Sequence, residues 1–350
     1  MTVQPPNITG SDDIPANAVL ATGGGGPGTF DRRVRTGRRI KAEHIRDYGI
    51  VVFFVAIFVY FSLASSVFLT SGNLLNLVYA NAVVGIPACA VTLTVIAGNF
   101  DLSLGGIFTL AEVLCAWAAV HWGVWWCFPV AIVVGGGMGL VNGLIRTKLR
   151  VNAFLATLAT GFVFTGVALA ASGGFNIIPS KGVNIFTFIG QTKVGGIQYP
   201  DLILLAVAVV LQLVLALTVF GRHLYGLGGN TEAARLSGLK VDRLVIITFV
   251  LTGVACGIAG LIDASNTGQG SASNALAPNL ALDAIAGVAL GGTSIFGGVG
   301  AVWRTMVGVL MLGMITNGFD LLGVATYWQS VVTGALIIIA VAVGALIERR

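Results

Sequence analysis

Residues 50–100 read IVVFFVAIFVYFSLASSVFLTSGNLLNLVYANAVVGIPACAVTLTVIAGNF, a window without a single Asp, Glu, Lys or Arg. A helix needs about 20 apolar residues to cross the hydrocarbon core of a bilayer, so this window is long enough for two crossings. The turn-forming cluster Thr70-Ser71-Gly72-Asn73 marks the break between them. Backbone polar groups in lipid must be satisfied within the segment, and both crossings are therefore predicted to be helices.

The rest of the chain has the same character. Of its 350 residues, 56% are hydrophobic and 9% are charged, whereas a soluble domain has about a quarter of its residues charged. The composition predicts an all-α polytopic membrane protein with about ten transmembrane helices, some of them short or discontinuous. Beyond the two crossings in residues 50–100, the expected spans lie near 104–120, 124–145, 153–172, 201–220, 244–263, 281–298, 303–322 and 325–347.

The basic residues predict the orientation of these spans. Loops rich in Lys and Arg stay in the cytoplasm. With a cytoplasmic N-terminus and alternating spans, every Lys and Arg except Lys181 and Lys193 falls on the cytoplasmic side. Both termini are therefore predicted to be cytoplasmic, in a bacterial plasma (inner) membrane. The net charge of +5 is then a consequence of topology, so no nucleic-acid partner is expected, although a basic face could bind anionic membrane lipid.

Two parts of the chain differ in composition. Residues 1–48 contain GGGGPG and PPN without apolar periodicity, which predicts a disordered, basic cytoplasmic tail. Residues 49–350 form the transmembrane domain, with a cytoplasmic loop at 221–243. Cys89, Cys115, Cys127 and Cys256 lie in apolar segments without metal-ligand spacing, and they are expected to be buried small hydrophobes. No metal site, cofactor or catalytic residue is predicted.

Polar residues interrupt the apolar runs at two places. GNFDLSLGG, residues 98–106, contains Asn99, Asp101 and Ser103. It is either a tight interfacial turn, with Asp101 or Ser103 capping the next helix, or a break in a discontinuous helix that lines a substrate route. LGGTSIFGGVG, residues 290–300, could be the matching break in the second half. The candidate substrate-pathway residues are Asn99, Asp101, Ser103, Thr293 and Ser294.

Acidic residues inside predicted spans admit two interpretations. Glu112, Asp283 and Asp320 are either structural polar residues satisfied by their neighbours or sites for a coupling proton or cation. The second interpretation leads to an ion-coupled secondary transporter that uses Asp101, Glu112 and Asp283. The sequence contains no GxxxxGK[ST] phosphate loop, so if transport is driven by ATP, a different chain must bind the nucleotide.

The stretch LGGNTEAARLSGLKVDR, residues 227–243, is unusually polar for this chain. Asn230 or Thr231 can cap a helix, Glu232 then lies in its first turn, and Gly238 can end it. A helix of about two turns does not persist alone in water, so it must pack against a surface. It is either a linker helix held by its own protein or by lipid, or a docking helix for a soluble partner.

The string GGNTEAARLSGLKV within this stretch resembles the EAA motif of the permease subunits of ATP-binding cassette importers, in its ribose-type monosaccharide form. GLVNGLIRTKLRVNAFLATLATG, LDAIAGVALGGTSIFGGVG and TNGFDLLGVATYWQ are also similar to segments of that family. The resemblance covers about residues 73–343. The sequence departs from the family pattern at Asn99-Phe100, where Gly-Ile is usual, at Ala153, where proline is common, and at Asp320, often Asn.

The resemblance implies a transport subunit and not an enzyme. It implies three kinds of partner: a nucleotide-binding ATPase subunit in the cytoplasm, an extracytoplasmic sugar-binding protein, and a second permease copy in a homodimer. The connection at 173–199 is the candidate contact for the binding protein. The resemblance assigns the ATPase-coupling loop to Gly229, Asn230, Glu232, Ala233, Ala234, Ser237 and Gly238.

Overall fold

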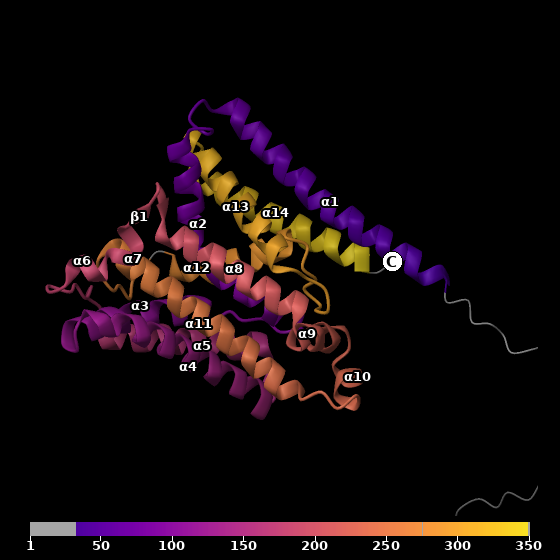
Figure 1. Cartoon of the computed structure of the whole chain (residues 1–350), viewed down its shortest axis with the longest axis horizontal. Helices are drawn as coiled ribbons and strands as arrows, with labels where there is room; N and C mark the ends of the chain where they lie inside the picture. Colours follow the sequence, from indigo (N-terminus) through magenta and orange to yellow (C-terminus); the bar gives the residue numbers. More distant parts are fainter. Residues whose placement is uncertain (1–32, 275, 349–350) are drawn as a thin grey trace, which may run out of the picture. The chain divides into compact units, whose positions relative to one another are not determined.

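The computed structural model describes residues 33–274 and 276–348, and this part of the chain is predominantly helical. The long helices are α1 (Arg33–Ala64), α2 (Ser71–Ile96), α3 (Leu104–His121), α4 (Cys127–Lys148), α5 (Ala153–Ser172), α8 (Tyr199–Leu217), α11 (Val241–Thr267), α12 (Ala277–Leu290), α13 (Val302–Leu321) and α14 (Thr326–Glu348) (Figure 1). The shorter elements are η1 (Val124–Trp126), α6 (Val183–Phe186), α7 (Phe188–Gln191), α9 (Val219–Gly229), α10 (Thr231–Leu236), β1 (Lys193–Val194) and β2 (Ile197–Gln198).

The helices confirm an all-α, multi-pass architecture. In the described residues, 7 helices are long and apolar enough to cross a membrane, and Gly49–Ala64 and Ala277–Leu290 are shorter apolar helices. The predicted range 281–298 differs most in extent, because α12 ends at Leu290 and not near residue 298. Gly292 has a φ of 69° there, a left-handed conformation that glycine adopts without strain and that ends a helix. Residues 291–301 therefore form a loop.

The chain divides into two units, Met1–Ala42 and Glu43–Arg350. Residues 1–32 of the predicted tail lie outside the described residues. The rest of that tail, residues 33–48, forms the first part of α1. The elements from α2 to α14 all belong to the unit from Glu43 onward.

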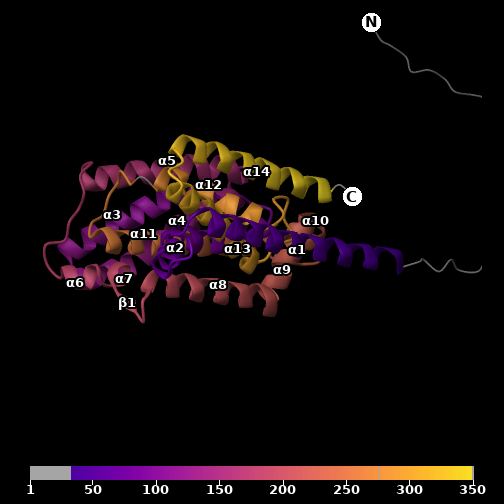
Figure 2. The ribbon, with the colours of Figure 1, turned by 90° about the horizontal axis from the view of Figure 1, so that it is seen from above.

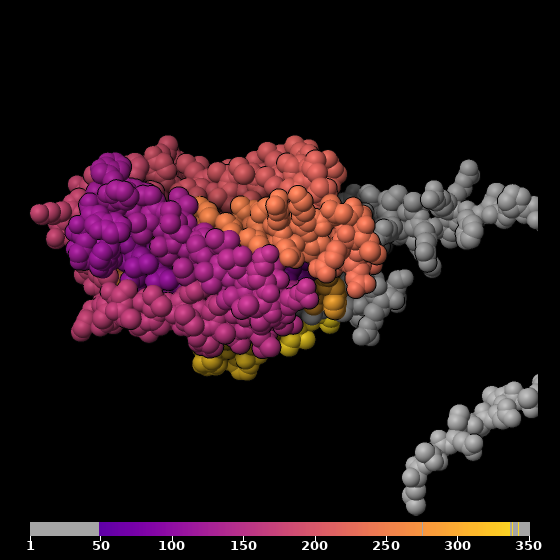
Figure 3. Space-filling view, turned by 90° about the horizontal axis from the view of Figure 1, so that it is seen from below, coloured from indigo at the N-terminus to yellow at the C-terminus, as the bar shows by residue number. Residues whose placement is uncertain are grey.

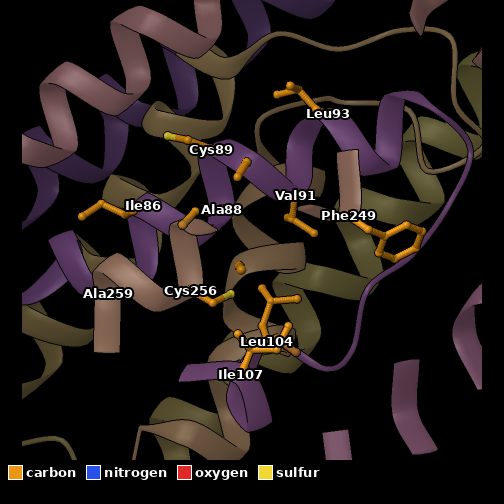
Figure 4. Close-up of a cluster of buried hydrophobic side chains, with 14 of the residues drawn as sticks. Ile86, Ala88, Cys89, Val91, Leu93, Leu104, Ile107, Phe249, Cys256 and Ala259 are labelled. Carbon is orange, nitrogen blue, oxygen red and sulfur yellow. The ribbon is translucent and has the colours of Figure 1, made fainter. Parts of the chain in front are cut away.

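The centre of this unit is an apolar cluster shared by α2, α3 and α11. Ile86 and Cys89 of α2, Leu104 of α3, and Phe249 and Cys256 of α11 belong to this cluster, and each of these side chains is fully buried (Figure 4). All four cysteines are free and buried, which confirms their predicted role as small hydrophobes. Close packing of this kind fixes the positions of the helix ends that carry polar residues.

Glycines bring α4 and α11 into backbone contact. Gly135 and Gly139 lie one turn apart on α4, and a Cβ atom on either would collide with a carbonyl oxygen of α11, from Gly253 and Phe249 respectively. Small residues at a spacing of four let membrane helices approach closely. Figure 3 shows the two helices side by side on one face, α4 in magenta and α11 in orange.

The segment between α5 and α8 is folded and anchored. Its hairpin pairs β1 with β2 around Gly195 and Gly196, whose φ values of 59° and 89° are both positive, as a type I′ turn requires. The backbone N–H of Gly190 donates to Ser265 Oγ at 2.7 Å, so α7 is fixed to the end of α11. Elements α6, α7 and β1 lie at the end of the unit opposite α9 and α10 (Figures 1 and 2).

Candidate coupling segment and polar breaks

Residues 229–238, here named the coupling segment, form a short capped helix. Asn230 Oδ1 accepts a hydrogen bond from the backbone N–H of Ala233 at 2.9 Å, which confirms Asn230 as the N-cap of α10. At the other end, the N–H of Leu239 donates to the carbonyl of Ala234 at 3.1 Å, and Gly238 has a φ of 83°. A left-handed glycine with such a bond is the usual way to satisfy the last carbonyls of a helix.

One side of α10 packs against the protein and the other is free. Ala234 is buried, whereas Glu232 and Ala233 are exposed and Leu236 is 89% exposed. A leucine so fully exposed beside small residues provides an anchor that another protein surface can cover. The docking role of this helix is a prediction that the geometry allows.

Backbone contacts join the end of α9 to the last residue of α2, which precedes the first break, and to the second break. A Cβ atom on Gly228, at the end of α9, would collide with the carbonyl oxygen of Ile96 and with the backbone N of Gly298. The N–H of Gly298 donates to that same carbonyl at 2.9 Å. Tyr225 of α9 also donates its hydroxyl hydrogen to the carbonyl of Gly300 at 2.8 Å. The end of α9, the end of α2 and the second break therefore meet at one place, directly before the coupling segment and the first break in the sequence.

The first break belongs to a buried hydrogen-bond network. Asp101 Oδ1 accepts from the backbone N–H of Ser103 at 2.9 Å and from its hydroxyl at 2.6 Å. Asn142 Nδ2 of α4 donates to Ser103 Oγ at 2.6 Å, and Thr160 of α5 donates to Asn142 Oδ1 at 2.7 Å. All four residues are buried. Ser103 occupies the N-cap position of α3, but its side chain makes no capping bond.

The second break is also buried. Thr293 and Ser294 are nearly inaccessible, and Ser294 Oγ accepts from the N–H of Phe296 at 3.2 Å. Within the described ranges, no side-chain hydrogen bond links either residue to Asn99, Asp101 or Ser103. The structure thus brings the two breaks together through backbone atoms, and a shared substrate pathway stays a prediction.

Two of the three predicted acids, Glu112 and Asp320, have hydrogen-bond partners, whereas Asp283 is half-buried in α12. Glu112 of α3 is buried and accepts from the N–H of Ser271 and from Asn274 Nδ2, both at 2.9 Å. The same amide of Asn274 donates to Asp263 Oδ2 at 2.6 Å. Asp320 accepts from Gln329 Nε2 at 2.8 Å. These bonds favour the structural interpretation of Glu112 and Asp320. Asp263 was not among the predicted candidates, although its position as an acid within an apolar run is enough to mark it as one.

Comparison with known proteins places these features in a family. Residues 73–341 match the family model described as branched-chain amino acid transport system / permease component. The ribose import permease protein RbsC of Bacillus subtilis is 39% identical over 295 residues, covering 83% of this chain and 88% of the relative. The L-arabinose ABC transporter permease protein AraH of Azospirillum brasilense is 34% identical over 299 residues, covering 85% and 87%.

A third relative carries another sugar in its name. The xylose transport system permease protein XylH of Haemophilus influenzae is 29% identical over 369 aligned residues, covering 87% of this chain and 97% of the relative. No solved structure matches the chain.

Proposed function

Since the chain belongs to the permease family of ATP-binding cassette importers, as a multi-pass subunit of the bacterial inner membrane, we propose that it translocates an aldopentose. Ribose, arabinose and xylose, the sugars in the names of the relatives, share this size and chemistry. Membership of the family also favours ATP-driven import over the ion-coupled alternative. The subunit itself is a transport component and not an enzyme.

The coupling mechanism rests on one observation, the contact of Gly228 with Ile96 and Gly298. An ATPase subunit that docks on Leu236 and Glu232 of the coupling segment would move α9 and α10 together, because a capping residue, Asn230, joins them. Movement of α9 then presses on the carbonyl of Ile96, two residues before the first break, and on the backbone of the second break. The breaks are the two-state element that the ATPase biases, and no bond chemistry occurs on this chain.

The remaining features of the importer follow the same topology. About ten spans with cytoplasmic termini place α10 inside the cell and residues 173–198 outside, where a sugar-binding protein docks on the folded segment that holds Lys181 and Lys193. A second copy of the chain completes the pathway, as a homodimer in contact with membrane lipid. Asn99, Asp101, Ser103, Thr293 and Ser294 line the route, where amide and hydroxyl groups suit sugar hydroxyls.

The coupling role is tested by reversing the charge of Glu232. The variant Glu232→Arg, assembled with the cognate ATPase and binding protein in proteoliposomes, is expected to lose most of the sugar-stimulated ATPase activity, by about tenfold or more, because a reversed charge disrupts a docked surface. Glu232→Gln keeps the size of the side chain and serves as the control with a smaller loss. Both variants should insert and purify as the wild type does. Unchanged stimulation in Glu232→Arg would contradict the docking of α10.

The substrate class is tested on the cognate binding protein by titration calorimetry. Ribose, xylose and arabinose are compared with leucine, because the family model is described by branched-chain amino acid transport. We expect the binding protein to bind at least one of the pentoses and not to bind leucine. Leucine binding without any pentose would refute the proposed substrate and leave the importer function intact.

A further inference from the structure

A cavity of about 650 Å³ lies beside the coupling segment. Three separate parts of the chain line it: residues 97–99 at the start of the first break, residues 146–148 and 150 at the end of α4 and just after it, and residues between Leu227 and Val245 that include part of α10. Its lining is strongly basic. The cationic side chains on it are Arg146, Lys148, Arg150, Arg235, Lys240 and Arg243, and Asp242 is the single acidic residue among the described lining residues.

The orientation of basic residues toward the cytoplasm explains why these cations share one side of the membrane. It does not explain why six of them, from segments far apart in the sequence, surround one hollow. Like charges gathered at short range repel one another, so the arrangement is stabilised when an anion neutralises it. The convergence points to a ligand that carries several negative charges.

Two local features show that the basic lining of the cavity has a fixed structure. Arg146 Nε donates to Asn99 Oδ1 at 2.9 Å, and Asn99 is only 5% exposed, so a buried amide fixes the guanidinium at the cavity. Arg150 has a φ of 54° and is the one non-glycine residue with positive φ in the described part of the chain. Such a conformation is unfavourable for a residue with a side chain, and it persists where the surroundings impose it.

We propose that this cavity binds a multiply charged phosphate anion. Guanidinium groups donate paired hydrogen bonds to phosphate oxygens, and lysine ammonium groups add compact charge. The volume is that of a typical small-molecule site. Because its walls include both Arg235 of α10 and Arg150 of the α4–α5 connection, a bound phosphate ties the coupling segment to that connection. The phosphate comes either from a soluble ester or from a lipid headgroup.

The binding test uses the full chain in nanodiscs of phosphatidylcholine, with tripolyphosphate as the probe in titration calorimetry. The double variant Arg235→Gln/Arg243→Gln is expected to bind at least about tenfold more weakly than wild type, since it loses two charge-assisted contacts. The control Arg222→Gln/Lys193→Gln removes the same charge from exposed residues outside the cavity lining, and its affinity should stay within about twofold of wild type.

A second arm separates the two sources of phosphate. Nanodiscs that contain cardiolipin, whose headgroup carries two phosphates, are analysed by native mass spectrometry for lipid retained on the protein. More retained cardiolipin on wild type than on the double variant identifies a headgroup, whereas tripolyphosphate binding without such retention identifies a soluble ester. Both results support a phosphate site. Absence of both, or an equal loss in the control variant, overturns it.

A separate measurement tests whether bound phosphate links the coupling segment to the α4–α5 connection. This measurement does not depend on the coupling role proposed for α10. Tripolyphosphate should slow amide hydrogen exchange at residues 231–236 and at residues 146–150 together in wild type, and in neither range in the double variant. Slower exchange in only one of the two ranges would refute the bridge. An uncoupled Glu232→Arg transporter that still binds tripolyphosphate would separate a failure of docking from a failure of this site.

Discussion

Thr160 takes part in a chain of side-chain hydrogen bonds that joins three helices. It donates to Asn142 of α4 from its place on α5, and Asn142 in turn donates to Ser103 at the start of α3. Buried polar groups of this kind are costly when one partner is removed, since the other is left without a hydrogen bond. Thr165 lies on the same helix, but its hydroxyl donates only to the carbonyl of Gly161 within α5.

Replacement of these two threonines by valine is expected to have different effects. Thr160→Val leaves Asn142 Oδ1 buried without a donor and should destabilise the protein by about 1–3 kcal/mol. Thr165→Val breaks no bond between helices, and its effect should stay within about 0.5 kcal/mol. Thermal unfolding of the two variants in the same detergent measures the difference. Equal unfolding temperatures would show that the network does not stabilise the helix contacts.

For single residues, the sequence predicts a hydrogen bond best when its two partners lie close together along the chain. The cap at Asn230 follows from residue type and local spacing, and the structure has it. The proposed cap at Ser103 did not form, because its hydroxyl bonds Asp101 and Asn142 instead. Asn142 comes from another helix, and no local pattern indicates a partner that tertiary packing supplies.

Among the elements, α9 carries a direct test of the proposed coupling route. Gly228 faces the carbonyl oxygen of Ile96, whereas a Cβ on Gly226 of the same helix would meet nothing within 4 Å. Gly228→Ala should therefore displace α9 and lower sugar-stimulated ATPase activity in the assembled transporter. Gly226→Ala, the matched control, should retain activity close to wild type. If the two variants behave alike, the contact at Gly228 has no part in coupling.

The contact between α4 and α11 gives a second test at the same scale. Gly135→Val places a branched side chain against the backbone of Gly253, and overpacking of this kind costs about 1–3 kcal/mol. Gly137→Val is the control, because a Cβ on Gly137 meets nothing within 4 Å. The unfolding temperature in detergent should fall for Gly135→Val alone. A similar fall in both variants would mean that helix propensity, and not contact, sets the effect.

Helix positions were largely predictable because hydropathy alone marks an apolar crossing. The expected range 153–172 coincides with α5, and 104–120 with α3 to within one residue. The end of α12 was missed, since Gly291-Gly292 stops the helix within a run that is still apolar. The spacing of Gly135, Gly139 and Gly143 was a readable signal for close helix packing, but it does not name α11 as the partner.

For the molecule as a whole, topology can be measured by thiol labelling. The four native cysteines are buried, which leaves little background for a membrane-impermeant maleimide. Lys193→Cys should be labelled from outside intact cells, and Arg235→Cys only in inverted vesicles, since both positions are exposed and are predicted on opposite sides. Labelling of both positions from the same side would overturn the predicted orientation.

The sequence of one chain predicts least about the assembled transporter. Charge distribution predicts which side each loop faces, because insertion is governed by Lys and Arg near the spans. The basic cavity was not predicted, since its six cations lie in two segments, residues 146–150 and 235–243, that are far apart in the sequence and adjacent only after folding. Each segment alone resembles an ordinary cytoplasmic connection with its flanking helix ends.

The glycine contact between α4 and α11 also has a consequence for biosynthesis. The chain is made from its N-terminus, so α4 enters the membrane long before α11 leaves the ribosome. During that interval the helix that covers the glycines at 135, 139 and 143 in the folded protein is absent. The centre of the protein can close only once residues 241–267 are inserted. A nascent chain truncated before that point therefore leaves this face of α4 without its partner, however well its first spans are inserted.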